Sequence, residues 1–220
     1  MSRCARWLSL LLGVAPMSIA AAAPQPPAFS VTGLQGWSVE TFLSQTHTQY
    51  HLARDSGLQV LHARCNNSAS GLIWKGSVNL QKTPVLHWRW KIAGLYPGTD
   101  ERTKAGDDFP ARVYVVTGTR WLPWTLKGLS YVWSNGSGHG AHGQPYWSSP
   151  YTDQAFMYAV RAGPADVGQW QGETRNVRAD FKQVFGADVD SLGAVAVMTD
   201  CDDSHSRDQA WYGDLYFASR

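Results

Sequence analysis

Alternation of apolar and polar residues with a period of two constrains this chain more than any other feature of its sequence. The clearest example is the segment Pro84–Ala93. Its apolar positions are Leu86, Trp88, Trp90 and Ile92, and the positions between them are His87, Arg89 and Lys91. Because side chains of a β-strand point alternately to the two faces of its sheet, this segment predicts a strand with one buried face. A shift of one residue in register would bury three cations.

Segments with a similar pattern recur along the chain, and turn residues such as Asp55-Ser56-Gly57 separate most of them. The further expected strands are Trp37–Phe42, Thr46–Arg54, Leu58–Cys65, Gly71–Leu80, Ala111–Thr117, Leu129–Ser134, Ala155–Arg161, Ala194–Thr199 and Ala210–Phe217. Many short strands with glycine-rich turns predict an all-β fold, in which two antiparallel sheets pack as a sandwich of the jelly-roll type.

One segment, Asn176–Phe185, shows helical spacing instead. Val177, Phe181 and Val184 recur at this spacing, Asn176 suits the N-cap, and Gly186 is placed to end the helix. We therefore expect one short helix near residues 176–186, which covers an end or an edge of the sandwich.

The N-terminal segment has the pattern of a secretory signal peptide. Arg3 and Arg6 form a basic start, Trp7–Ile19 is apolar, and small residues follow at Ala20–Ala23. We expect residues 1–23 to be a signal peptide and residues 24–220 to form a single domain in the periplasm or outside the cell. The alternative is an uncleaved membrane anchor, but the apolar run is short for a bilayer span. No later stretch is long and apolar enough for a transmembrane segment.

Two cysteines, Cys65 and Cys201, remain after removal of the expected signal peptide. An oxidising compartment would permit a disulfide between them, which would add about 4–5 kcal/mol to stability in the chain-entropy model. The alternative is that both are small buried hydrophobic residues. The sequence leaves these two alternatives open.

Charge and aromatic content restrict the class of partner. The formal net charge is +2 and no Lys/Arg run occurs, so nucleic acid is not an expected partner. The chain contains 11 Trp and 9 Tyr residues, which serve either as core or as a binding surface.

Extending the alternation predicts such a surface. Its expected ligand-binding residues are His87, Arg89, Asp107, Arg112, Tyr114, Tyr131, Trp133, Tyr212 and Asp214. If their strands share a sheet, they form one polar and aromatic face, which suits sugars because C–H groups stack on aromatic rings and charged groups bond hydroxyls. The alternative is that the aromatic residues are buried.

Acidic residues suggest two further roles. Asp200, Asp202 and Asp203 crowd one loop and offer oxygen ligands for a structural calcium ion, the one cofactor that the sequence suggests. Asp108 and Glu173 are the candidate general acid and base of a polysaccharide-cleaving enzyme. The plainer alternative is that these residues are solvated turn carboxylates. His139 and His142 lack a visible third metal ligand, so we expect loop histidines there.

Several segments together resemble a known family. They are Ser68–Leu72, His87–Lys91, Gly106–Val115, Tyr131–Trp133, Met198–Asp200 and Trp211–Asp214. The chain resembles the bacterial domain of unknown function 3047 over nearly all of its expected mature length. The resemblance implies a secreted bacterial protein with a sandwich similar to galactose-binding and carbohydrate-binding modules. The chain departs from the family's usual Asp-Thr-Asp-Asn pattern at Cys201.

Three functional classes follow from these features. The first is an exported protein that recognises a glycan on its polar and aromatic face. The second is a glycoside hydrolase or lyase with paired carboxylates, and the third is a structural envelope protein without a ligand. A concave, aromatic-lined groove would separate the first two from the third.

Overall fold

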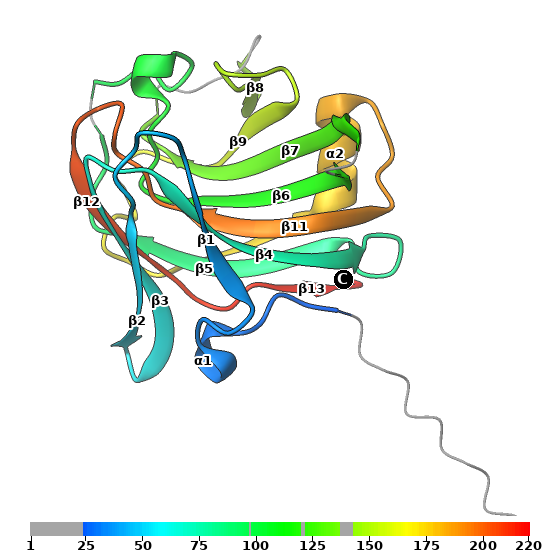
Figure 1. The fold of residues 1–220 in the computed structure, drawn as a ribbon, viewed down its shortest axis with the longest axis horizontal. Coiled ribbons are helices and arrows are strands. Elements are labelled where there is room, and N and C mark those ends of the chain that lie inside the picture. The colour runs from blue at the N-terminus through cyan, green and yellow to red at the C-terminus, as the bar shows by residue number, and fades with distance from the viewer. Residues whose placement is uncertain (1–23, 97, 120–121, 137–142) are drawn as a thin grey trace, which may run out of the picture.

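The computed structural model describes residues 24–220 except 97, 120–121 and 137–142, and contains two β-sheets (Figure 1). Sheet A has seven strands in the order β1 (Trp37–Thr41), β4 (Ser70–Asn79), β11 (Ser191–Met198), β6 (Arg112–Thr119), β7 (Leu122–Ser134), β9 (Ala155–Ala162) and β8 (Tyr146–Ser148). Sheet B consists of β10 (Gln171–Asn176), β5 (Val85–Ile92), β12 (Arg207–Tyr212), β3 (Leu58–Asn66) and β2 (Gln49–Asp55), and β13 (Tyr216–Ala218) also pairs with β5. The β-sandwich of jelly-roll type expected from the sequence is confirmed.

The hydrophobic core lies between the two sheets. Strand β5 contributes the four apolar residues of its alternating pattern, each at most 3% exposed. Sheet A faces them with Val113, Tyr131 and Trp133. The rings of Trp90 and Trp133, from opposite sheets, have centroids 5.9 Å apart. Packing of large rings across the interface removes much apolar surface from water, which is the main stabilising contribution in such a sandwich.

Helix α2 (Val177–Phe185) follows β10 directly, at the end of the sandwich where β6 ends and β7 begins (Figure 1). The side chain of Asn176 accepts a hydrogen bond from the backbone N–H of Ala179, and Gly186 ends the helix in the left-handed conformation with φ of 66°. Both match the expected caps. Val177 and Phe181 are buried in the core, so the helix covers part of it.

The structure differs from the sequence-based expectation in several elements. A short helix α1 (Phe29–Thr32), a 3-10 turn (Lys104–Gly106) and the strands β8 and β10 were not expected. Strand β10 lies at one edge of sheet B, and its sequence has no apolar alternation. Both sheets were expected to be antiparallel, but strands β7 and β9 of sheet A pair in parallel.

The segment expected as one strand over Ala210–Phe217 divides into β12 and β13. Between them Gly213 donates a backbone hydrogen bond of 2.9 Å to the carbonyl of Arg89. A Cβ atom at Gly213 would lie 2.5 Å from Cγ of Arg89, so any other residue here would force the side chain of Arg89 to move. The break changes which residues of the segment face outward.

Two expectations fall outside the described residues, namely the signal peptide at residues 1–23 and the histidines His139 and His142. None of the helices in the described part of the chain combines the length and the apolar character that a membrane span requires.

Candidate functional site

The strands that were expected to share one polar and aromatic face belong to two different sheets. Strands β5 and β12 are in sheet B, whereas β6 and β7 are in sheet A. Tyr131, Trp133 and Tyr212 are each 0% exposed and lie in the core between the sheets. The expectation of a shared surface is therefore wrong. Alternation shows which residues of one strand share a face, but not which strands are neighbours or which face is inside.

The buried aromatic residues have internal partners. The hydroxyl of Tyr131 donates to Asp180 Oδ2 at 2.8 Å, and that of Tyr212 donates to the carbonyl of Met198 at 2.6 Å. Trp133 Nε1 donates to the carbonyl of Gly163 at 3.3 Å. Dissolved ligand does not reach these side chains, so their expected ligand-binding role does not fit their position.

Two of the expected residues, Arg112 and Tyr114, do border a cleft. They alternate with the buried Val113 and Val115 on β6, so they point to the outer face of sheet A, away from sheet B. The cleft has a volume of about 390 Å³. Its lining includes Phe42, Leu43, Asp107, Arg112, Tyr114, Tyr151, Met157, Met198, Asp200, Asp202 and Asp203.

A buried ion-pair network forms the base of this cleft. Arg112 is 2% exposed, and its Nε donates to Asp200 Oδ1 at 2.8 Å while a second N–H bonds Asp200 Oδ2. Its Nη1 donates to the hydroxyl of Tyr114 at 3.0 Å and to Asp107 Oδ1 at 3.4 Å. A bidentate guanidinium–carboxylate pair of this kind compensates for much of the cost of burying both charges. The arrangement holds the side chains under the cleft in fixed positions.

The electrostatics of this network keep the guanidinium charged, and burial raises the pKa of both of its carboxyl partners, Asp107 and Asp200. Burial alone would lower the pKa of Arg112, but Asp200, Tyr114 and Asp107 outweigh it and hold this pKa well above its usual value. Burial raises the pKa of Asp107 to about 6, against the opposing effect of Arg112. Asp107 therefore changes its protonation state close to neutral pH, which is a property of many functional carboxyl groups.

The expected calcium ligands are divided by the structure. Both carboxylate oxygens of Asp200 accept hydrogen bonds from Arg112. Asp202 and Asp203 instead lie with Asp108, and one carboxylate oxygen of each falls within 4.8 Å of the others. Burial raises the pKa of both Asp202 and Asp203, with a further contribution from Asp108. Only one oxygen of each carboxylate belongs to this group, so its three ligand atoms fall short of the six to eight oxygens that calcium usually takes.

The expected catalytic pair is not brought together. Asp108 is 1% exposed and accepts hydrogen bonds from the backbone N–H groups of Asp203 at 3.3 Å and Ser204 at 2.6 Å. Glu173 lies on β10 of sheet B, where Oε1 accepts from Trp90 Nε1 at 3.1 Å and Arg161 Nε at 2.8 Å. Asp108 shapes a loop and Glu173 anchors an edge strand, so the two do not face each other across the cleft.

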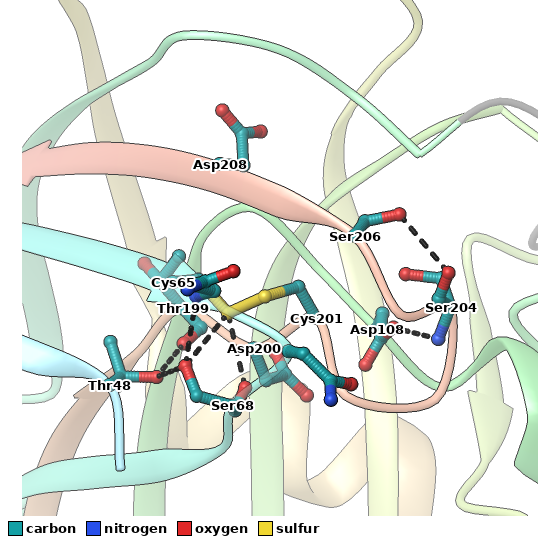
Figure 2. Close-up of a disulfide and its surroundings, with 12 residues drawn as sticks. Thr48, Cys65, Ser68, Asp108, Thr199, Asp200, Cys201, Ser204, Ser206 and Asp208 are labelled. Atoms are coloured by element: carbon teal, nitrogen blue, oxygen red, sulfur yellow. Dashed lines mark hydrogen bonds between the residues drawn. A yellow bond between two sulfur atoms is a disulfide. The ribbon is translucent and has the colours of Figure 1, made fainter. Parts of the chain in front are cut away.

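A disulfide between Cys65 and Cys201 links the loop that follows β11 to strand β3 of sheet B, as Figure 2 shows. Cys65 is near the end of β3 in sheet B, and Cys201 directly follows Asp200. The backbone N–H of Cys201 also donates to the carbonyl of Ser68 at 3.1 Å. The bond connects residues 136 positions apart and fixes the start of the loop that carries Asp202 and Asp203.

A family model described as "Protein of unknown function (DUF3047)" matches residues 35–216. The chain belongs to this family. No curated protein matches the DUF3047 chain.

Several solved structures are similar to the DUF3047 chain. The xyloglucanase domain of NopAA, a type three effector from Sinorhizobium fredii, in complex with cellobiose, has a TM-score of 0.46 at 9% identity over 90% of this chain and 98% of that chain. The cellulose induced protein Cip1 has a TM-score of 0.44 at 11% identity over 84% and 91%. Endoglucanase 3 of Trichoderma harzianum, from family GH12, has a TM-score of 0.42 at 9% identity over 90% and 97%.

Sequence reasoning missed several cleft residues of the DUF3047 protein. Tyr151 is 56% exposed, and its hydroxyl donates to Asp203 Oδ2 at 3.2 Å. Phe42 and Leu43 are also exposed and lie just after β1. All three residues lie in loops, and Phe42 was expected as the last residue of the strand Trp37–Phe42, which ends at Thr41. Only the aromatic content of the chain pointed toward residues of this kind.

The remaining expected residues of the DUF3047 protein lie elsewhere. His87 and Arg89 are on the outer face of sheet B, where the ring of His87 stacks on Tyr216 with centroids 4.8 Å apart. The guanidinium carbon of Arg89 lies 4.6 Å from the ring centroid of Trp170. Asp214 accepts a backbone hydrogen bond of 2.9 Å from Ser30 and so holds α1. None of these three lines the cleft on sheet A.

Proposed function

We propose that this DUF3047 protein binds a glycan in the cleft on the outer face of sheet A. The observation that carries the proposal is the fixed polar base of the cleft, formed by Arg112, Asp107 and Asp200, with the exposed ring of Tyr151 beside it. Polar groups held by buried partners bind with little loss of conformational entropy. Carboxylates that face a cleft accept hydrogen bonds from sugar hydroxyls.

Much of the rest of the cleft lining is aromatic or apolar and suits the C–H groups of a sugar ring. The C–H groups of a sugar ring pack on aromatic and apolar side chains, and Phe42, Met157, Met198 and Tyr151 supply these. Acidic side chains outnumber basic ones in the lining, where Arg112 is the single cation among the residues that the structure describes. This balance favours neutral sugars over anionic ones.

A second function, cleavage of the bound glycan, is favoured by one specific observation. Asp107 lines the cleft, and burial raises its pKa to about 6, so it holds the proton that a general acid needs up to about pH 6, and a fraction of it does so at neutral pH. Asp202 and Asp203 line the same cleft and offer a second carboxylate. In this version of the enzyme hypothesis Asp107 replaces the expected pair of Asp108 and Glu173.

Export remains part of the proposal, on the basis of the signal-peptide pattern at residues 1–23. The expected result is a mature chain that begins close to Pro24 in the periplasmic or extracellular fraction. Mass spectrometry of the fractionated protein measures this directly. A full-length chain retained in the cytoplasm would contradict export.

The binding proposal is tested with residues 24–220 on an array of neutral and anionic glycans, followed by titration calorimetry on the hits. Tyr151→Ala removes the exposed ring and is expected to weaken binding of a neutral glycan by about tenfold or more. Tyr216→Ala is the matched control, because Tyr216 is 52% exposed but lies on β13, away from the cleft. Equal losses in both variants, or no neutral ligand at all, would contradict the proposal. New reducing or unsaturated ends in the reaction products would identify an enzyme.

A further inference from the structure

The outer face of sheet B carries polar and aromatic side chains in rows that cross from strand to strand. In the first row, Arg64 of β3 pairs with Gln49 of β2 on one side and with Gln209 of β12 on the other. Paired residues of neighbouring strands project from the same face of a sheet, as do residues two positions apart on one strand. Arg207 and its partner Asn66 therefore project on this face as well.

A second row adjoins the first, two residues further along the strands. It consists of His51 of β2, His62 of β3, Trp211 of β12 and Lys91 of β5. We call the seven residues Gln49, Asn66, Arg64, Arg207, Gln209, His62 and Trp211 the sheet B ladder. Sheet B separates the ladder from the core, and the cleft on sheet A lies beyond that core.

The ladder borders a groove of about 450 Å³. Its lining includes Gln49, Arg64, Asn66, Arg207, Gln209 and Asp208. Arg64 and Arg207 are exposed, and in the described ranges of the chain neither of them has a carboxylate within 4.0 Å. Asp208 is the one acidic residue among the lining residues, and its Oδ1 accepts a 2.8 Å hydrogen bond from the backbone of Gln209. The groove thus presents two guanidinium groups without an anionic partner.

A chain of hydrogen bonds holds the amide of Gln209 in place. The oxygen of this amide accepts a hydrogen bond of 2.9 Å from His62 Nε2. His62, when neutral, must then accept at Nδ1, which lies 2.9 Å from His51 Nε2. Burial lowers the pKa of His62 and favours this neutral form. The NH₂ group of Gln209 is left to donate to a molecule in the groove.

We propose that this groove is a second binding site, which takes the carboxylate group of an acidic oligosaccharide. Arg64 and Arg207 together bind the carboxylate through paired N–H donors, which is the geometry that guanidinium groups favour. The amides of Gln49, Asn66 and Gln209 both donate and accept, as the hydroxyl groups of the same sugar require. The acidic cleft on sheet A and the basic groove on sheet B therefore select sugars of different charge.

The ladder is a poor match for nucleic acid. Single-stranded nucleic acid binds where bases stack on free aromatic faces within a strongly basic channel. The ring of Trp211 is already covered, because His62 stacks on it with centroids 4.7 Å apart and Lys91 Nζ lies 4.4 Å from its centroid. Lys91 is itself paired with Asp55. The net charge of +2 does not supply the density that phosphate binding needs.

The test uses residues 24–220 and tetramers of galacturonate, glucuronate, mannuronate and guluronate as probes, measured by titration calorimetry. The wild type is expected to bind at least one of them, more weakly as salt rises. Arg64→Gln and Arg207→Gln are each expected to weaken that binding by tenfold or more. Arg54→Gln is the matched control, because Arg54 is exposed on β2 at a position that alternates away from the ladder.

Four results would overturn the proposal. The first is that no uronate tetramer binds the wild type, and the second is that Arg54→Gln weakens binding as much as Arg64→Gln. The third is that a thymidine octamer binds as tightly as the best uronate and loses the same affinity in Arg64→Gln. Tyr151→Ala keeps this test separate from the cleft, since it is expected to leave uronate binding unchanged. If it weakens uronate binding, the anionic sugar binds in the cleft and the second site does not exist.

Discussion

Arg112 and Asp200 form a buried bidentate ion pair although they are 88 residues apart in the chain, with Nε of Arg112 2.8 Å from Oδ1 of Asp200. They meet because β6 and β11 are neighbours in sheet A, where Arg112 pairs with Met198. The same contact fixes the base of the cleft and the loop that carries its acidic side chains.

Arg112→Met is expected to lower the free energy of unfolding by about 3–5 kcal/mol, because it leaves the buried Asp200 and Asp107 without a cation. Urea denaturation measures the loss. Arg102→Met is the control, since the Arg102–Asp100 pair is exposed and its removal is expected to change nothing measurable. The double variant Arg112→Met with Asp200→Leu should recover part of the stability. A double variant less stable than Arg112→Met would contradict this account.

Asp107 should make stability fall as pH rises toward neutrality. The folded chain keeps this proton up to about pH 6, whereas the unfolded chain loses it near pH 4, so the folded form binds more protons between these values. Stability from this group is therefore present below about pH 4 and is lost as pH rises through about 6, by roughly 1–3 kcal/mol. Comparing Asp107→Asn with the wild type from pH 4 to 7 measures the effect. Identical pH profiles, or a carboxyl NMR signal of Asp107 that titrates near pH 4, would disagree with this prediction.

Loss of the Cys65–Cys201 bond should destabilise the protein and loosen the loop of Asp202 and Asp203. Opening a link between residues 136 positions apart is expected to cost about 5 kcal/mol in the chain-entropy model. Denaturation of the Cys65→Ser, Cys201→Ser double variant gives the cost, and hydrogen exchange of residues 202–206 reports the loop. Unchanged exchange in this loop would show that Asp108 and Ser68 hold it without the disulfide.

Trp133→Ala should behave as a core substitution and not as a loss of ligand contact. The ring is fully buried against Trp90, so its removal is expected to cost about 3–5 kcal/mol. Tyr216→Ala, at an exposed ring, is expected to leave stability nearly unchanged. Chemical denaturation compares the two. If Trp133→Ala lowered the free energy of unfolding only slightly but abolished glycan binding, Trp133 would be a ligand-binding residue and the prediction would be wrong.

The outer face of sheet B, which carries the sheet B ladder, was predicted only in part from the sequence. Alternation placed His87, Arg89 and Lys91 correctly on the outer face of β5, because a strand with an intact pattern reports its own two faces. It then assigned Tyr212 to the same surface, whereas Trp211 is the residue that projects there and Tyr212 is buried. The turn at Gly213 ends β12, so counting through it as one strand moved the assignment by one residue.

The sequence by itself determined the β-sandwich, most of its strands and the helix with its two caps, because these follow from interactions between residues near one another in the chain. Tertiary structure alone decided that Arg112, Asp107 and Asp200 meet, that Glu173 lies apart from Asp108, and that Tyr131 and Trp133 face inward. These facts depend on the order of strands in each sheet and on the loops that join them. Residues far apart in sequence become neighbours only through the order of the strands, and alternation within one strand does not predict that order.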